Sequence, residues 1–388
     1  MTRGHRARSF CPVHFFGLER ATSAGLLATG LLLLGAPARG QAPIPADAGT
    51  KDLPQETEVA AGPRLVARIF GDVDWQSPRD DLPNTFTVGQ LALFLTSELA
   101  SNLSLIAEVA FEIPEDAEAQ IAEVERLQVR WAPLDAVNFS VGRMHTQLGH
   151  WNQTYHHGTW LQTTAFRPEV YRWEDEGGGL LPVHEVGVRF GGALSGGPLR
   201  VEYSVSLANG RGQTPQDVVT VQDPNGSKAV SLWLGFRPQA IPGLQVGGAA
   251  VFDTIPPDPE DAARGTELRE RILGGFLVFR NPRIELLAEA FGIRHEDESE
   301  GQAWTTTGLY AQAAFTAGRL KPYYRFDLVD RSQGDPFFGP DTPGIEKHTM
   351  GLRVDPWSRL AVKLELSHSR LEPGGSFEAG AVQMAFTF

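Results

Sequence analysis

The chain has 388 residues, a formal net charge of −13 at pH 7 and a single cysteine, Cys11. The acidic excess disfavours nucleic acid as a partner, because phosphate backbones are themselves negative. Beyond residue 40 no cysteine remains, which excludes disulfides and thiol chemistry for the rest of the chain.

Residues 1–40 are typical of a secretory signal peptide. Arginines precede an apolar run, "ATSAGLLATGLLLLGAP" (21–37), and small residues follow in "APARGQA" (36–42). Residues 41–62 are rich in Pro, Ala and acidic residues, and we expect a flexible periplasmic lead-in there. No later run of 18 apolar residues follows, so no transmembrane helix is expected.

A period of two dominates the sequence from residue 63 to residue 388. In "LSLIAEVAFE" (103–112) apolar residues alternate with Ser and Glu, and "PYYRFDLV" (322–329) sets Tyr324, Phe326 and Leu328 against Arg325 and Asp327. Strict alternation of this kind predicts β-strands with two different faces.

Short breaks such as "APLDA" (132–136) and "RNPR" (280–283) alternate with longer polar breaks, among them 113–120, 295–303 and 370–378. The segmentation gives about sixteen strands of about 9–12 residues, long enough to cross a membrane when tilted. We therefore predict an all-β fold, a transmembrane antiparallel up-and-down β-barrel over residues 63–388. A soluble antiparallel protein would not explain the alternating loop lengths.

The last eight residues, "AVQMAFTF" (381–388), form an alternating segment that ends on Phe388. This ending is similar to the signature that the barrel assembly machinery of Gram-negative outer membranes recognises. Together with "NFSVGRMHTQLGHWN" (138–152) and "ANGRG" (208–212), it makes the chain resemble the Gram-negative outer-membrane porin superfamily. The closest likeness is to sixteen-stranded porins, including the phosphate-selective type.

The resemblance implies the cell outer membrane as the location, with membrane lipid around the barrel and the assembly machinery acting through Phe388. It also implies small polar solutes as cargo and a possible homotrimer. Lysine is scarce, so phosphate selectivity is not part of the expectation.

Residues 144–182 form the third long connection, which in porins commonly folds into the barrel. The segment is rich in aromatic and amide side chains that tolerate partial burial, and its acidic stretch "EDEGGG" (174–179) is expected to be an exposed tip. We predict a pore-constricting or plugging loop whose working residues are His145, His150, Trp151, Asn152, Tyr155, His156, His157 and Trp160.

Three other interpretations of this segment are weaker. A metal site needs three or four converging ligands, but there is no HxxxH pattern, and adjacent histidines usually point apart on extended backbone. A hydrolase needs a nucleophile beside a histidine, and Ser367 and His368 are strand neighbours that face opposite sides. A plain surface loop is the third. We therefore expect no metal, no cofactor and no enzymatic activity.

Alternation also assigns charged residues to the lumen. The inward basic set is Arg64, Arg68, Arg126, Arg130, Arg143, Arg189, Arg200, Arg237, Arg269, Arg271, Arg283, Arg325, Lys347, Arg353 and Lys363. The inward acidic set is Asp72, Asp74, Glu108, Glu112, Glu185, Glu202, Glu285, Glu289, Asp327 and Glu365. Opposed charges of this kind either set an ionic selectivity, here a weak anion preference, or pair across strands and only solvate the wall.

The predicted function is that of an outer-membrane porin for passive diffusion of small polar solutes or ions. The alternative is a plugged outer-membrane barrel with a structural or surface-binding role.

Overall fold

The computed structural model describes residues 64–77, 84–112, 121–172, 179–215, 223, 226–261, 264–339 and 343–388. All of them belong to one compact unit, residues 60–388. The predicted signal peptide (1–40) and lead-in (41–62) lie outside the described residues, and so does most of the predicted acidic loop tip.

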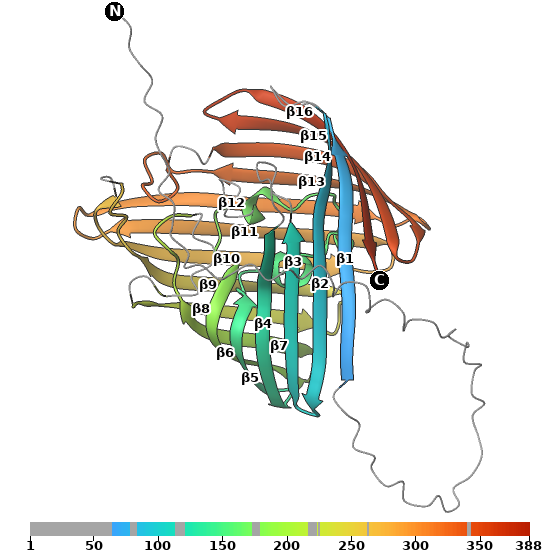
Figure 1. The fold of residues 1–388 in the computed structure, drawn as a ribbon, viewed down its shortest axis with the longest axis horizontal. Helices are drawn as coiled ribbons and strands as arrows, with labels where there is room; N and C mark the ends of the chain where they lie inside the picture. Colours follow the sequence, from blue (N-terminus) through green and yellow to red (C-terminus); the bar gives the residue numbers. More distant parts are fainter. Residues whose placement is uncertain are drawn as a thin grey trace, which may run out of the picture. The chain divides into compact units, whose positions relative to one another are not determined.

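Sixteen antiparallel strands form a closed barrel (Figure 1). Each strand pairs with its sequence neighbours, and β1 pairs with β16, so the predicted architecture is confirmed. The strands are β1 (Arg64–Gln76), β2 (Thr85–Ala100), β3 (Leu103–Glu112), β4 (Ile121–Leu134), β5 (Val137–His145), β6 (His184–Gly196), β7 (Leu199–Asn209), β8 (Lys228–Pro238), β9 (Leu244–Ile255), β10 (Leu268–Arg280), β11 (Ile284–Asp297), β12 (Gln302–Phe315), β13 (Leu320–Asp330), β14 (Gly344–Trp357), β15 (Leu360–Glu372) and β16 (Ser376–Thr387).

Two short helical segments, α1 (Trp151–Tyr155) and η1 (Glu169–Tyr171), lie between β5 and β6. Among the described residues, no helix is long and apolar enough to cross a membrane.

Connection lengths follow the predicted alternation over most of the chain. The longest connection, 146–183, joins β5 to β6, whereas β4 and β5 are joined by two residues only. Two of the predicted long connections are short, however, because their flanking strands continue further than expected: 298–301 joins β11 to β12, and 373–375 joins β15 to β16.

The two faces of a strand differ as the period of two predicts. In β13, Arg325 and Asp327 are fully buried, whereas Tyr324, the residue before Arg325, is 42% exposed. The exposed outer face is apolar on most strands, as a lipid-facing surface requires. Its large side chains include Leu127, Val129, Val188, Phe190, Leu232, Leu234, Leu273, Leu286, Met350, Leu364, Leu366, Val382 and Met384.

The C-terminal strand closes the barrel. Phe388 and Ile69 exchange two backbone hydrogen bonds, of 2.9 and 3.1 Å, and Phe386 stacks on Phe388. This pairing satisfies the backbone groups of both terminal strands, which a membrane-spanning sheet cannot leave open. Recognition of Phe388 by the assembly machinery stays a prediction.

Part of the inner face is an apolar core instead of a wet lumen. We call the inner faces of β8 to β12 the apolar wall; its large buried side chains are Trp233, Val251, Ile255, Leu268, Ile272, Phe276, Val278, Leu287, Phe291, Ile293 and Tyr310. Side chains of the 146–183 connection pack against it, so these residues are shielded from water by the protein itself.

The apolar wall overturns one facing assignment. Arg269 and Arg271 are exposed on the outer side of β10, and Glu270 between them is the inward residue. Buried Glu270 accepts from Arg211 Nη1 at 2.7 Å and lies 3.1 Å from His295 Nε2. The assignment was wrong because it placed Leu268 and Ile272 against lipid, whereas both pack inside.

Candidate functional site: the inward loop between β5 and β6

The loop runs from residue 146 to residue 183, because β5 ends at His145 and β6 begins at His184. It therefore starts two residues later and ends one residue later than the predicted segment 144–182. His145 belongs to the strand, and the other seven predicted loop residues lie within the loop. Residues 173–178 are outside the described residues.

A single carboxylate of the wall holds the start of α1. Glu289 of β11 accepts hydrogen bonds from the backbone N–H groups of His150 (3.0 Å) and Trp151 (2.7 Å). The Tyr171 and Tyr310 hydroxyls donate to it at 2.8 and 2.7 Å. The first N–H groups of a helix have no partner within the helix, and Glu289 supplies one from the wall.

Aromatic rings fill the space between α1 and the apolar wall. Trp151 stacks on Tyr171, with ring centroids 5.2 Å apart, and Tyr171 meets Phe291 edge-on. Burial and the Glu289 carboxylate raise the pKa of Tyr171 well above its ordinary value. The phenol therefore stays protonated and keeps donating to Glu289. On the other side of α1, Arg280 lies over the ring of Tyr155.

The opposite side of the loop meets charged side chains. We call the inner faces of β13, β14 and β15 the charged wall; its loop-binding residues are Arg325, Asp327, Lys347, Arg353, Lys363 and Glu365. The guanidinium of Arg325 is fully buried and donates to Thr164 Oγ1 and to the carbonyls of Phe166 and Arg167, at 2.8–3.1 Å. Asp327 accepts from the backbone N–H of Glu169 at 3.0 Å.

Lys363 and Glu365 of β15 clamp the middle of the loop. The buried ammonium of Lys363 donates to the carbonyls of Thr159 (2.5 Å) and Thr164 (2.8 Å) and to Gln383 Oε1. The Glu365 carboxylate accepts from the backbone N–H of Ala165 at 2.6 Å. These wall charges are therefore engaged with backbone groups of the loop.

Three further wall residues also hold the loop. Arg353 donates to the carbonyls of Trp160 (2.8 Å) and Gln162 (2.6 Å), and Glu285 of β11 accepts from Thr163 Oγ1 at 2.6 Å. Lys347 pairs with Glu169 at 2.7 Å. Burial alone would raise the pKa of Glu169, but the nearby cations, Lys347 foremost, outweigh it and lower that pKa below its ordinary value.

Of the remaining predicted lumen charges, Asp72 accepts a hydrogen bond from Thr159 Oγ1 of the loop at 3.1 Å. Two arginines pair with carboxylates of the wall instead. Arg126 pairs with Glu108 across β3 and β4, and Arg189 pairs with Glu185 and donates to the carbonyl of His145. Arg68 on β1 and Arg130 on β4 are exposed, and both occupy strand positions on the inner face of the barrel.

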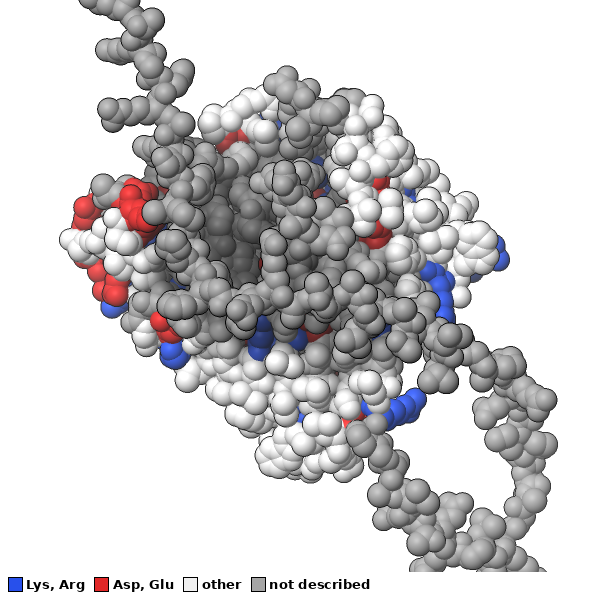
Figure 2. Space-filling model, viewed as in Figure 1, with Lys and Arg blue, Asp and Glu red and all other residues white. Residues whose placement is uncertain are grey.

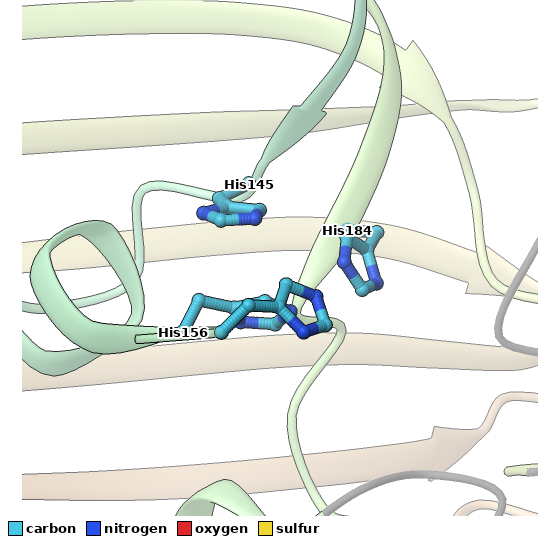
Figure 3. Close-up of side chains that lie close together, drawn as sticks. His145, His156 and His184 are labelled. Carbon is cyan, nitrogen blue, oxygen red and sulfur yellow. The ribbon is translucent and has the colours of Figure 1, made fainter. Parts of the chain in front are cut away.

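Four histidines meet where the loop leaves and rejoins the wall. His145 and His184 are cross-strand partners at the ends of β5 and β6, while His156 and His157 directly follow α1. Ring centroids lie 4.0 Å apart for His145 and His156, 4.3 Å for His156 and His157, and 4.5 Å for His156 and His184. Figure 3 shows the three labelled rings facing one another from separate elements.

The premise that His156 and His157 point apart is thus wrong. His156 is the C-cap of α1, with φ −27° and ψ −60°, so the backbone there is not extended, and the rings of His156 and His157 meet edge-on. Burial and the neighbouring His145 hold the pKa of His156 well below its ordinary value, so its ring is neutral. Of the predicted loop histidines only His150, at the N-cap of α1, lies outside the cluster.

Two members of this site were missed from the sequence, His184 and Glu125. The register of β4 shifts opposite Glu108 and Val109, which inserts Glu125 as an extra residue beside Arg126. A bulge of this kind places two consecutive side chains on one face. Glu125 is buried, and its Oε2 lies 2.8 Å from His184 Nε2 and 3.2 Å from His157 Nε2. Strict alternation would have placed it on the outer face.

Charge also gathers on the rim of the barrel. Figure 2 shows acidic side chains at the end of β11 and β12, at the left of the view. The acidic residues in and beside the 298–301 connection are Glu296, Asp297, Glu298 and Glu300. The predicted polar connection 113–120 lies outside the described residues.

No family model matches the chain, and no curated protein matches it either. Solved structures do. An anion-selective porin from Comamonas acidovorans superposes with a TM-score of 0.58 at 12% identity, over 84% of this chain and 100% of that one. OmpF of Salmonella typhi gives 0.58 and 12%, over 84% and 97%. The trimer form of OmpT, an outer membrane protein of Vibrio cholerae, gives 0.55 and 9%, over 84% and 100%.

The chain has a porin fold. At these identities the likeness establishes the fold, and it agrees with the sixteen-stranded closed barrel described above. The position of the loop between β5 and β6, folded against the inner wall of a porin barrel, makes it the candidate functional element.

Proposed function

We propose that the protein is an outer-membrane channel for passive diffusion of small polar solutes or ions, narrowed by the loop 146–183. The observation that carries this proposal is the docking of the loop on both the apolar and the charged wall. A loop held by wall residues on β11, β13, β14 and β15 occupies cross-section that solutes would otherwise use.

A weak preference for anions is the finer part of the proposal. Arg325, Arg353 and Lys363 are engaged by loop carbonyls, so they are poorly placed to meet a passing ion. Other cations of the inner faces are exposed or partly exposed near the short turns. We call these the basic belt: Arg68, Arg130, Arg200 and Arg237. Cationic rings favour anions in a pore, and Glu202, which pairs with Arg200 and Arg237, offsets the belt only in part.

Single-channel recording in a planar bilayer tests both parts. We expect steady conductance, which rises when residues 150–170 are replaced by a short Gly/Ser linker. The reversal potential in a salt gradient should have the sign of anion preference. It should shift toward zero in the double variant Arg200→Gln/Arg237→Gln and stay unchanged in Arg269→Gln/Arg271→Gln, whose arginines lie on the outer face.

The plugged barrel is the competing function, and the extensive apolar packing of the loop favours it. A folded wild-type barrel that conducts only after the loop is replaced would contradict the open channel and support the plug. Cation-selective conductance would retain the channel and reject the anion preference.

The outer membrane as location, lipid as surroundings and a homotrimer as assembly belong to the same proposal. The trimer rests on the fold likeness to a protein solved in a trimer form. Native mass spectrometry of the detergent-extracted protein measures it directly, and a monomer would contradict it. The proposal includes no covalent chemistry and no cofactor.

A further inference from the structure

The histidine cluster has the composition and convergence of a metal centre. His145, His156, His157 and His184 each offer one ring nitrogen, and these four atoms all lie within 4.8 Å of one another. Tetrahedral zinc with bonds of 2.0–2.1 Å places its nitrogen ligands about 3.3 Å apart. Small rotations of the four rings would therefore bring the nitrogens to bonding distance.

The side-chain amide of Asn152 orients the ring of His156. Asn152 Nδ2 donates to the carbonyls of Thr146 and Val183, both at 2.9 Å. The amide oxygen of Asn152 must then face His156 Nδ1, 2.6 Å away, and accept its proton. With Nδ1 protonated, neutral His156 carries its lone pair on Nε2, the tautomer that can bind a metal.

His157 is oriented in the same manner. Its Nδ1 lies 2.8 Å from the side-chain oxygen of Gln90 on β2, which can only accept. Its Nε2 lies 3.2 Å from the Glu125 carboxylate. Outer partners that fix the tautomer of a ligating histidine are a general feature of metal sites.

A third feature of the cluster is the burial of His145, at the end of β5. Within the described residues, neither ring nitrogen of His145 has a hydrogen-bond partner, although the ring is buried. A buried polar ring in that condition costs free energy that a ligand would recover.

We propose that His145, His156, His157 and His184 bind one divalent transition-metal ion of the zinc class, with the Glu125 carboxylate beside two of these rings as a charge partner. Imidazole nitrogens suit zinc, copper, nickel and cobalt, whereas calcium and magnesium require oxygen ligands. Two ligands come from the loop and two from the ends of β5 and β6. A bound ion would therefore tie the loop to the wall by its own bonds.

The test is metal binding by the full mature chain, folded in detergent and freed of metal with a chelator. Zn²⁺ is titrated by calorimetry, and Co²⁺ by its visible absorption, which is intense for tetrahedral nitrogen coordination and weak for the hydrated ion. We expect one ion per chain and an intense Co²⁺ band.

Variants assign the binding to the cluster. His156→Gln and His184→Gln should each weaken Zn²⁺ binding at least about 100-fold, and Asn152→Leu, which removes the amide that orients His156, about 10-fold. The matched control is His348→Gln/His368→Gln, which removes two partly exposed histidines paired across β14 and β15 and should leave the affinity unchanged.

Folding of each variant is checked by heat-modifiable electrophoretic mobility. If the cluster variants do not fold, the wild-type Co²⁺ spectrum decides: a folded chain with no intense band overturns the proposal. Zn²⁺ binding that survives both cluster variants, or that is lost only in the His348/His368 control, overturns it as well. None of these measurements depends on conductance, so they stand apart from the channel function.

Discussion

The apolar wall and the charged wall hold the same loop by different means. On the apolar wall, the rings of Phe291 and Tyr310 contact the ring of Tyr171 from the loop, within one buried cluster. On the charged wall, Arg325 and Lys363 each make several directed hydrogen bonds to loop carbonyls. Apolar burial is roughly proportional to area and has little direction, whereas charge-assisted hydrogen bonds depend on geometry. The first wall should set how firmly the loop docks, and the second in which conformation.

The largest expected effect comes from removing a loop side chain that packs on the apolar wall. Tyr171→Ala removes a fully buried ring that stacks on Trp151 and donates to Glu289. Removing a buried aromatic side chain costs about 3–5 kcal/mol. We expect much faster proteolysis of the loop and larger conductance fluctuations.

The control for Tyr171→Ala is Tyr324→Ala, because Tyr324 is 42% exposed on the outer face. It should cost about 1 kcal/mol or less and leave proteolysis of the loop unchanged. Equal effects of the two tyrosine variants would contradict the role of the apolar wall.

A smaller effect is expected from the charged wall. Lys363→Met removes the ammonium that holds Thr159 and Thr164 and retains a side chain of similar length. Hydrogen bonds to charged groups contribute about 1.5–3 kcal/mol each, but removing a buried charge recovers its desolvation cost. We therefore expect the free energy of unfolding to fall by about 1–2 kcal/mol. We also expect a clear change in the number of conductance substates of the channel.

Lys228→Met is the matched control, because Lys228 has a partly exposed side chain at the start of β8. If Lys363→Met leaves the conductance substates unchanged, the charged wall does not select the conformation of the loop.

The smallest effect is a dependence on pH through His150, which faces Arg280, Arg237 and Glu285. Burial, followed by the two arginines, lowers the pKa of His150 to about 3. The undocked ring, with a pKa near 6.5, binds a proton more readily than the docked ring. The free energy that holds the loop docked on the wall therefore decreases as the pH falls from about 6.5 toward 3. The decrease is at most about 1.4 kcal/mol per pH unit.

Loop proteolysis followed from pH 7 to pH 5 measures this dependence. His150→Gln should flatten the part of the pH profile that His150 causes, while His348→Gln should not. An unchanged profile in His150→Gln would assign the dependence to other groups.

The barrel itself was predictable because its signal repeats. Sixteen alternating segments report the same period, so the two connections that proved short, 298–301 and 373–375, did not disturb the strand count. Arg325, Asp327, Lys363 and Glu365 were placed inward correctly because their strands keep strict alternation.

Other features of the site are set by tertiary structure. Arg269 and Arg271 were misplaced because a loop from elsewhere in the chain makes the inner face of β10 apolar. Glu125 was missed because its bulge is visible only in the pairing of β3 with β4. The convergence of His184 with His156 depends on how the loop returns to β6, and no local pattern reports that path.

The partners of the loop lie far along the chain, and this sets the order in which the protein can fold. Ala165 bonds to Glu365, 200 residues later, and Thr159 bonds to Lys363, 204 residues later. The loop cannot reach its final place until β15 has been added, because its acceptors and donors there do not yet exist. Contacts this remote in sequence form late and slowly. The barrel is thus built around an undocked segment, and the interior is finished only after the wall is nearly complete.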